Sequence, residues 1–113
     1  MNATPIELPD AVSRYLEAHL VRNTPTALST FHDGATVTDE GIAHTGATAI
    51  ETWLSTAASE FTFTTEALGA EQLDDTHWVV TNRLEGDFPG GRADLRYRFT
   101  LRSGLIGDLT IAP

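Results

Sequence analysis

Beyond residue 60 the hydrophobic pattern of this chain keeps a period of two to its end. Before that point, outside residues 35–45, apolar side chains recur every three or four residues, which is typical of amphipathic helices. After it they alternate with polar side chains, which is typical of half-buried strands. The alternation is cleanest where Leu95, Tyr97, Phe99 and Leu101 interleave with Arg96, Arg98, Thr100 and Arg102. The chain therefore predicts an α+β fold, with helices on one face of a curved sheet.

Three helices are predicted, over residues 9–22, 24–31 and 46–59. The stripe of the first consists of Val12, Leu16, His19 and Leu20, with Tyr15 on its flank. Thr24 followed by Pro25 starts the second helix, which carries Ala27, Leu28 and Phe31 inward and ends at residues 32–34. In the third, Thr48 with Glu51 fits a capping box. Its apolar face consists of Ile50, Trp53, Leu54, Ala57 and Ala58.

The strands are predicted over residues 35–40, 42–45, 61–66, 77–87, 95–102 and 105–111. Turns at residues 73–76, 88–91 and 103–104 connect the last four into an antiparallel meander. On the strand 77–87, the side chains of Trp78, Val80, Asn82 and Leu84 share one side.

Asp39 is the candidate catalytic residue that the strand parity singles out. It shares a strand face with Ala35 and Val37, the face predicted to be buried, whereas Glu40 points outward. Burial in an apolar pocket raises a carboxyl pKa toward the range useful to a general base. The alternative is that Asp39 ends its strand and caps the turn at Gly41.

Composition excludes several classes of function. The 113 residues carry 16 Asp and Glu against 7 Arg and no Lys, a formal net charge of −9, which disfavours binding to nucleic acid or an anionic membrane. No cysteine is present, and no apolar run is long enough to span a bilayer. The first residues do not resemble a signal peptide. We expect one cytoplasmic domain over residues 1–113.

No motif in the sequence indicates a metal or a cofactor. The four histidines, His19, His32, His44 and His77, lack the paired spacing of metal ligands. There is no dinucleotide fingerprint, no phosphate-binding glycine loop and no G-x-S-x-G nucleophile motif. The sequence therefore predicts neither a metal site nor a nucleotide cofactor.

Four segments together resemble the SnoaL-like proteins of the nuclear-transport-factor-two-like superfamily: SRYLEAHLVRNTPTALSTF, ATVTDEG, HTGATAIETWL and RYRFTLRSGLIGDLTI. The resemblance covers essentially the whole chain. It implies a cone, or cystatin-like roll, with three helices, in which a strongly bent mixed or antiparallel sheet wraps a long N-terminal helix and leaves a pocket at the open end. It also implies that no cofactor is used and that two copies dimerise through the sheet.

The resemblance to ketosteroid isomerase within this superfamily assigns three catalytic candidates. Tyr15 matches its oxyanion-stabilising tyrosine and Asp39 matches its aspartate base. Tyr97 stands where that enzyme has a protonated aspartate, while Asp94, three residues earlier, faces the opposite way. This departure weakens the case for steroid isomerisation, although a tyrosine at this place can also donate to an oxyanion.

The further pocket-lining candidates are His19, Trp53, Phe63, Trp78, Asn82 and Phe99. For Trp53 and Trp78 the alternative is a place in the core between the third helix and the sheet. The predicted function is cofactor-free proton transfer, of the isomerase or cyclase kind, on a small apolar carbonyl-bearing molecule. The alternatives are a non-catalytic ligand-binding or dimerisation module and a protein-binding role.

Overall fold

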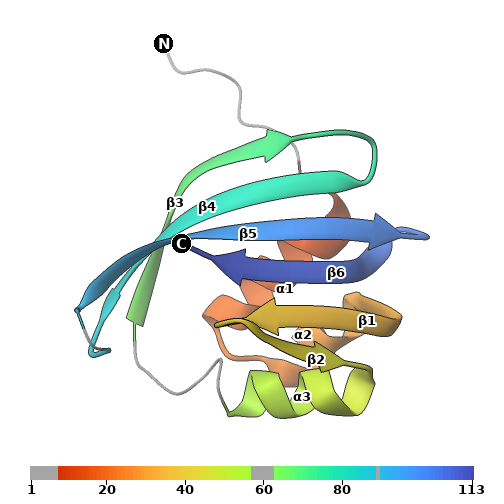
Figure 1. Ribbon diagram of the computed structural model, residues 1–113, viewed down its shortest axis with the longest axis horizontal. Coiled ribbons are helices and arrows are strands. Elements are labelled where there is room, and N and C mark those ends of the chain that lie inside the picture. Colours follow the sequence, from red (N-terminus) through yellow and green to blue (C-terminus); the bar gives the residue numbers. More distant parts are fainter. Residues whose placement is uncertain (1–7, 57–62, 89) are drawn as a thin grey trace.

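Three helices lie against one face of a six-stranded sheet in the described part of the chain, residues 8–56, 63–88 and 90–113 of a computed structural model (Figure 1). The helices are α1 (Asp10–Leu20), α2 (Thr24–Ser29) and α3 (Ala47–Ser55). The strands are β1 (Phe31–Asp39), β2 (Ile42–Thr45), β3 (Phe63–Gln72), β4 (His77–Gly86), β5 (Arg92–Arg102) and β6 (Leu105–Ala112). The predicted α+β class is confirmed.

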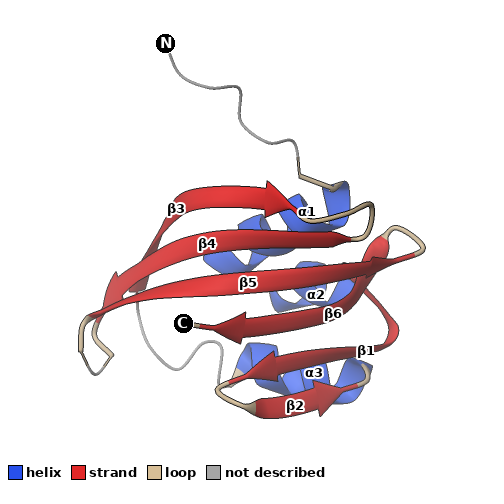
Figure 2. Cartoon of the chain, turned by 45° about the horizontal axis from the view of Figure 1, so that its top comes forward, coloured by secondary structure: helices blue, strands red, loops and turns tan. Residues whose placement is uncertain are grey.

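The sheet is mixed, with the strand order β2-β1-β6-β5-β4-β3. Neighbouring strands run antiparallel except for β1 and β6, which are parallel. Figure 2 shows that β4 and β5 extend beyond the end of β6 and that the sheet curves there. The curved sheet and the three helices enclose one apolar core, which includes Val37, Ile50, Phe99, Ile106 and Leu109.

The buried face of α1 differs from the predicted stripe. Its buried residues are Ala11, Val12, Tyr15 and Ala18, whereas Leu20 is 58% exposed, so the inward prediction for Leu20 is wrong. Alanine is small enough to let a helix approach a sheet closely. The face of α1 that packs on the sheet is therefore the one that carries the two alanines, and it is rotated about the helix axis from the predicted leucine stripe. Tyr15, expected on the flank, therefore lies inside the core and is fully buried.

The second helix is shorter than predicted. α2 ends at Ser29, and Phe31 together with residues 32–34 belongs to β1, so the prediction of a helix reaching Phe31 is wrong. The hydroxyl of Thr30 donates to the carbonyl of Ala27 (2.6 Å), and the carbonyl of Thr30 accepts from the backbone N–H of Ile106 (2.9 Å). These contacts end the helix and lead the chain into the sheet. Phe31 is nevertheless buried, as expected.

α3 begins without a side-chain cap, so the predicted capping box of Thr48 and Glu51 is wrong. The residue before the helix is Gly46, whose φ of 90° is accessible mainly to glycine. Its N–H donates to the carbonyl of Ala35 (2.9 Å), which attaches the helix start to β1. Ile50, Trp53 and Leu54 are buried as predicted, while the predicted contributions of Ala57 and Ala58 lie outside the described residues.

The predicted face of β4 is confirmed, because Trp78, Val80, Asn82 and Leu84 are all buried. Asp94 faces the outer side of the sheet, where its carboxylate pairs with Arg83 (2.8 Å). Among the described helices none is long and apolar enough to cross a membrane.

Candidate functional site

The register of the sheet places two of the three catalytic candidates in one row across its inner face. Asp39 of β1 pairs with Ile111 of β6, and Ile111 pairs with Tyr97 of β5. Residues directly opposite each other on neighbouring strands project from the same face. Neighbouring strands are about 4.8 Å apart, so the backbones of Asp39 and Tyr97 are separated by roughly 10 Å across the sheet. Their side chains project from the same concave face.

Asp39 is half-buried and is the last residue of β1 before the tight turn formed by Glu40 and Gly41. Its Oδ2 accepts a hydrogen bond of 3.1 Å from Nε1 of Trp53, a residue that is 2% exposed. No other hydrogen bond to this carboxylate occurs within the described residues, so Oδ1 keeps its lone pairs. No hydrogen bond between this carboxylate and the turn at Gly41, within the described residues, supports the alternative that Asp39 caps that turn.

Tyr15 reaches the same region from α1. Its ring packs edge-on against Phe31 and Phe99, with centroids 5.5 and 5.9 Å away. Its hydroxyl is sealed from solvent and has no hydrogen-bond partner in the described part of the chain. Burial, with smaller contributions from Tyr97 and Asp39, raises the pKa of Tyr15 well above its usual value. Tyr15 is therefore a neutral phenol whose O–H has no acceptor in the described part of the chain.

Tyr97 is also a neutral phenol. Burial, and secondarily the nearby Asp39, raise its pKa to about 12. Because the charge of Asp39 acts on both tyrosines, and Tyr97 acts on Tyr15, the three groups lie within electrostatic reach of one another. The fold therefore places one carboxylate and two phenol donors on or against the inner face of the sheet.

His19 lies beside this group, with its ring stacked on that of Tyr15 at 5.7 Å. Its pKa is lowered, chiefly by burial and then by Arg22, while Asp39 acts in the opposite direction. The side chain therefore favours its neutral form at pH 7. His19 and Arg22 also line a crevice between the helices, of about 10 Å³, which is room for about one water molecule.

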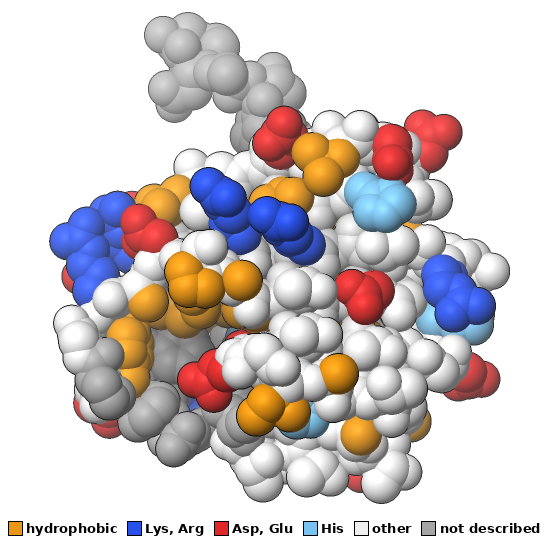
Figure 3. Space-filling model, in the orientation of Figure 1, with side chains coloured by type: hydrophobic (Ala, Val, Ile, Leu, Met, Phe, Trp, Pro, Cys, Tyr) orange, Lys and Arg blue, Asp and Glu red, His pale blue; other side chains and the backbone are white. Residues whose placement is uncertain are grey.

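The remaining pocket-lining candidates lie on either side of the Asp39–Tyr97 row. Phe99 and Trp78 are paired one row deeper, and Nε1 of Trp78 is a second sealed donor without a partner in the described part. Asn82 is one row nearer the ends of β1 and β6. Figure 3 shows that the surface is hollowed near these strand ends and that hydrophobic side chains border the hollow. The side chain of Phe63 lies outside the described residues.

The contact between Trp53 and Asp39 was not predicted from sequence, although both residues were candidates. The signal available was the shortness of the chain between them. A two-residue turn, a four-residue strand and Gly46 separate β1 from α3, so the helix must return over the end of β1. The ring of His44 lies 6.2 Å from that of Trp53 and adds to the packing of the indole.

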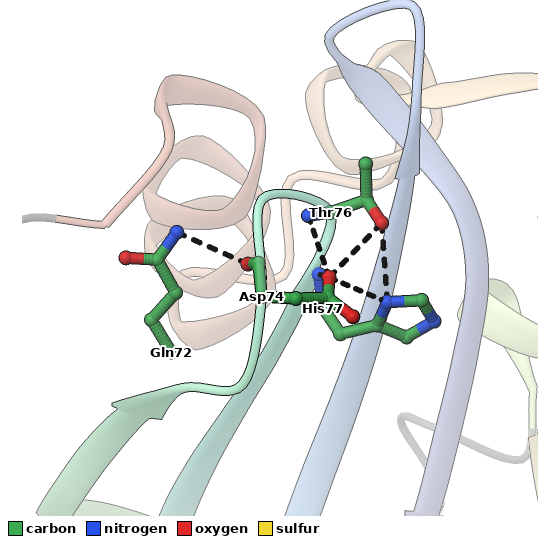
Figure 4. A network of polar contacts seen from close by, with 4 residues as sticks. All are labelled: Gln72, Asp74, Thr76 and His77. Atoms are coloured by element: carbon green, nitrogen blue, oxygen red, sulfur yellow. Dashed lines mark hydrogen bonds and ion pairs between the residues drawn. The ribbon is translucent and has the colours of Figure 1, made fainter.

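A separate cluster of polar contacts stabilises the turn between β3 and β4 (Figure 4). Oδ1 of Asp74 accepts from the backbone N–H groups of Thr76 and His77, both at 2.9 Å, and lies 2.8 Å from Nδ1 of His77. These bonds lower the pKa of Asp74 to about 2. Because the contacts are local and exposed, this cluster is a turn-stabilising network. The described residues contain no group of three or more His, Asp or Glu side chains placed to bind a metal.

Comparison with solved structures places the fold in a known class. A protein of Catenulispora acidiphila with a ketosteroid isomerase-like fold, solved with trimethylamine, superimposes with a TM-score of 0.80 at 16% identity, over 95% of this chain and 87% of that one. A Mycobacterium tuberculosis protein, solved with estradiol-17β-hemisuccinate, gives 0.76 at 13% identity, over 91% and 90%. The fold is therefore that of the ketosteroid isomerase-like proteins.

A more similar structure shows the family. A Sinorhizobium meliloti protein, named provisionally as a polyketide cyclase, is 34% identical, with a TM-score of 0.86 over 93% of this chain and 95% of that one. The chain belongs to the SnoaL-like group of the nuclear-transport-factor-two-like superfamily, as its sequence segments predicted. No family model and no curated protein matches the sequence.

Proposed function

We propose that this protein is a cofactor-free isomerase or cyclase that moves a proton on a small, apolar, carbonyl-bearing molecule. One observation carries the proposal: the half-buried carboxylate of Asp39 retains an unbonded oxygen, shares a row of the inner face with the neutral phenol of Tyr97, and lies within electrostatic reach of the neutral phenol of Tyr15. A base next to preorganised donors is the arrangement that removal of a proton beside a carbonyl requires.

In this mechanism Oδ1 of Asp39 takes a proton from the carbon next to the substrate carbonyl. The electron pair of the C–H bond becomes a carbon–carbon double bond, and the π electrons of the carbonyl move onto its oxygen. The hydroxyl of Tyr97 donates a hydrogen bond to the resulting enolate, and that of Tyr15 donates a second when the bound ligand opens the contacts that seal it. In a substrate whose enolate is conjugated with a second double bond, the proton returns from Asp39 to the far carbon of that double bond, which completes an isomerisation. In a cyclisation the enolate carbon instead attacks a second carbonyl of the same molecule, and the proton passes to the new alkoxide.

The surroundings of the three groups support an apolar substrate. Tyr15 packs against Phe31 and Phe99, and the core cluster also contains Trp53 and Trp78. The steroid ester bound by the Mycobacterium relative and the name of the Sinorhizobium relative agree with a bulky, carbonyl-bearing ligand.

Exchange of the α-protons of 2-tetralone in D₂O, followed by NMR, tests the proposal. The substitution Asp39→Asn keeps the shape of the side chain and the contact with Trp53 but removes the base, and we expect exchange to slow by about 10²-fold or more. Glu40→Gln, a change at the next, exposed carboxylate, is the matched control. Exchange that persists in Asp39→Asn contradicts the mechanism. Binding of tetralone to the unsubstituted protein without exchange indicates the ligand-binding module instead.

We also propose that two copies pair through the outer face of the sheet. The helices cover one face in Figures 1 and 2. The other face presents half-buried Val79, Thr81, Thr100 and Thr110 around the exposed Arg96 and Arg98 of β5. Sedimentation velocity over a range of concentrations tests the pairing. We expect a dimer that Thr81→Glu dissociates, and a monomer at every concentration contradicts the proposal.

A further inference from the structure

Asn82 is a buried polar side chain for which the mechanism above has no use. It is 4% exposed, and its neighbours on the inner face are apolar: Val80 and Leu84 along β4, Leu95 on β5 and Ala67 on β3. No hydrogen bond of its amide occurs within the described residues. A buried amide without a partner costs free energy, and folded proteins pair nearly all such groups.

The sealed side-chain polar atoms without a partner, in the described part of the chain, are the hydroxyl of Tyr15 and Nε1 of Trp78. The Asn82 amide is also unpaired within the described residues but is not among these sealed groups. Its two N–H donors and its carbonyl acceptor are therefore available to a ligand on this face.

The register fixes where Asn82 lies relative to the reacting groups. Tyr97 pairs with Val80, so Asn82, two residues further along β4, is a diagonal neighbour of Tyr97 at roughly 7–8 Å. Asp39 lies on the other side of Tyr97, three strands from Asn82, or roughly 14 Å along the sheet. The inner face thus carries polar groups at both ends of a surface with apolar residues between them.

We infer that Asn82 is a specificity-determining residue that binds a second polar group of the ligand. The ligand is a two-ended molecule: a carbonyl lies between Asp39 and the tyrosines, an apolar body crosses the row of Tyr97, and a second carbonyl or hydroxyl oxygen bonds the Asn82 amide. This inference rests on the proposed function for the position of the first carbonyl. It adds the chemistry of the far end of the substrate.

A pair of naphthols tests the inference, because a naphthol has the flat apolar body and hydroxyl of an enol. We compare the Kd of 2-naphthol with that of 2,6-dihydroxynaphthalene, which adds an oxygen at the far end. In the unsubstituted protein the second hydroxyl should tighten binding about three- to tenfold, as expected of one net hydrogen bond. In Asn82→Leu this advantage should disappear while 2-naphthol binds at least as tightly. The control Thr81→Val, on the outer face of β4, should preserve the advantage.

Two outcomes overturn the inference: an advantage that persists in Asn82→Leu, or no advantage in the unsubstituted protein. The second outcome means that water alone pairs the amide.

A measurement that needs no substitution supplements the test if Asn82→Leu does not fold. The side-chain amide resonances of Asn82 should shift when 2,6-dihydroxynaphthalene is added but not when 2-naphthol is added, and equal responses to both probes overturn the inference.

The test separates this inference from the proposed reaction. If α-proton exchange survives Asp39→Asn while the advantage of the second hydroxyl depends on Asn82, the reaction is wrong and the Asn82 contact stands. If exchange is lost in Asp39→Asn while the advantage is independent of Asn82, the reaction stands and the contact is wrong.

Discussion

Replacing Tyr15 with phenylalanine should stabilise the fold and weaken the activity, two effects that a purely structural tyrosine would not combine. The substitution removes one oxygen atom and leaves the ring contacts with Phe31 and Phe99 in place. The oxygen that is lost is fully buried and has no hydrogen-bond partner in the described part of the chain. In the absence of ligand, the folded state therefore bears the cost of desolvating this hydroxyl without a compensating bond.

The magnitude follows from the cost of such a group, about 1–3 kcal/mol. Removing the hydroxyl should recover part of this cost, since phenylalanine leaves a gap of one atom, and we expect a gain of about 1 kcal/mol. For a chain of this length that corresponds to a rise in Tm of about 4 °C. The rate of α-proton exchange should fall about 10²-fold, as is typical when one donor to a developing oxyanion is removed.

Differential scanning calorimetry and the tetralone exchange assay measure the two effects on the same preparation. Tyr97→Phe is the comparison, because the Tyr97 hydroxyl is not among the sealed, unpartnered groups of the described chain, and its loss should slow exchange with a smaller change in Tm. A lower Tm for Tyr15→Phe would refute the reasoning, since it would mean that the hydroxyl makes a stabilising bond. A higher Tm with unchanged exchange would remove Tyr15 from the mechanism and leave the stability argument intact.

Two further substitutions test contacts described above. Trp53→Phe removes the 3.1 Å bond to Asp39 and should lower the free energy of unfolding in urea by about 1.5–3 kcal/mol, as expected for a bond to a charged group, and also slow exchange; unchanged stability would contradict this. For Asp74 the pKa is lowered from 3.8 to about 2, so its contribution to stability is present above pH 3.8 and is lost as the pH falls toward 2. The difference in Tm between the unsubstituted protein and Asp74→Asn should therefore be largest above pH 4 and should shrink as the pH falls to 2. A difference that does not depend on pH would contradict the lowered pKa of Asp74.

Strand parity alone identified the residues of the inner face. A side chain on a strand projects to the same side as the residues two positions away, so Val37 predicted the orientation of Asp39, and Trp78 predicted that of Asn82. The prediction for Asp39 needed no knowledge of the partner strands, because the period of a strand is a property of its own backbone. The same reasoning correctly placed Asp94 on the face opposite to Tyr97.

Helix periodicity predicted the buried side chains less well, because the rotation of a helix about its axis is set by the elements that pack against it. The leucine stripe of α1 suggested that Leu20 would be buried, but the closer approach allowed by Ala11 and Ala18 turned Tyr15 into the core instead. The end of α2 and the start of α3 were likewise set by contacts with distant strands, Thr30 with Ile106 and Gly46 with Ala35. Such contacts are not encoded in the local pattern that predicts a helix.

The sequence by itself determined the class of fold, the order of the elements, the side to which each strand residue points and, through short matching segments, the family. The tertiary structure alone decided which of those residues meet. It placed β6 between β1 and β5, which brought Asp39 and Tyr97 into one row, and it laid α3 over the end of β1, which gave Asp39 its bond to Trp53. Orientation is a local property of the backbone, whereas proximity depends on how strands far apart in the chain pair and on how closely helices pack against them.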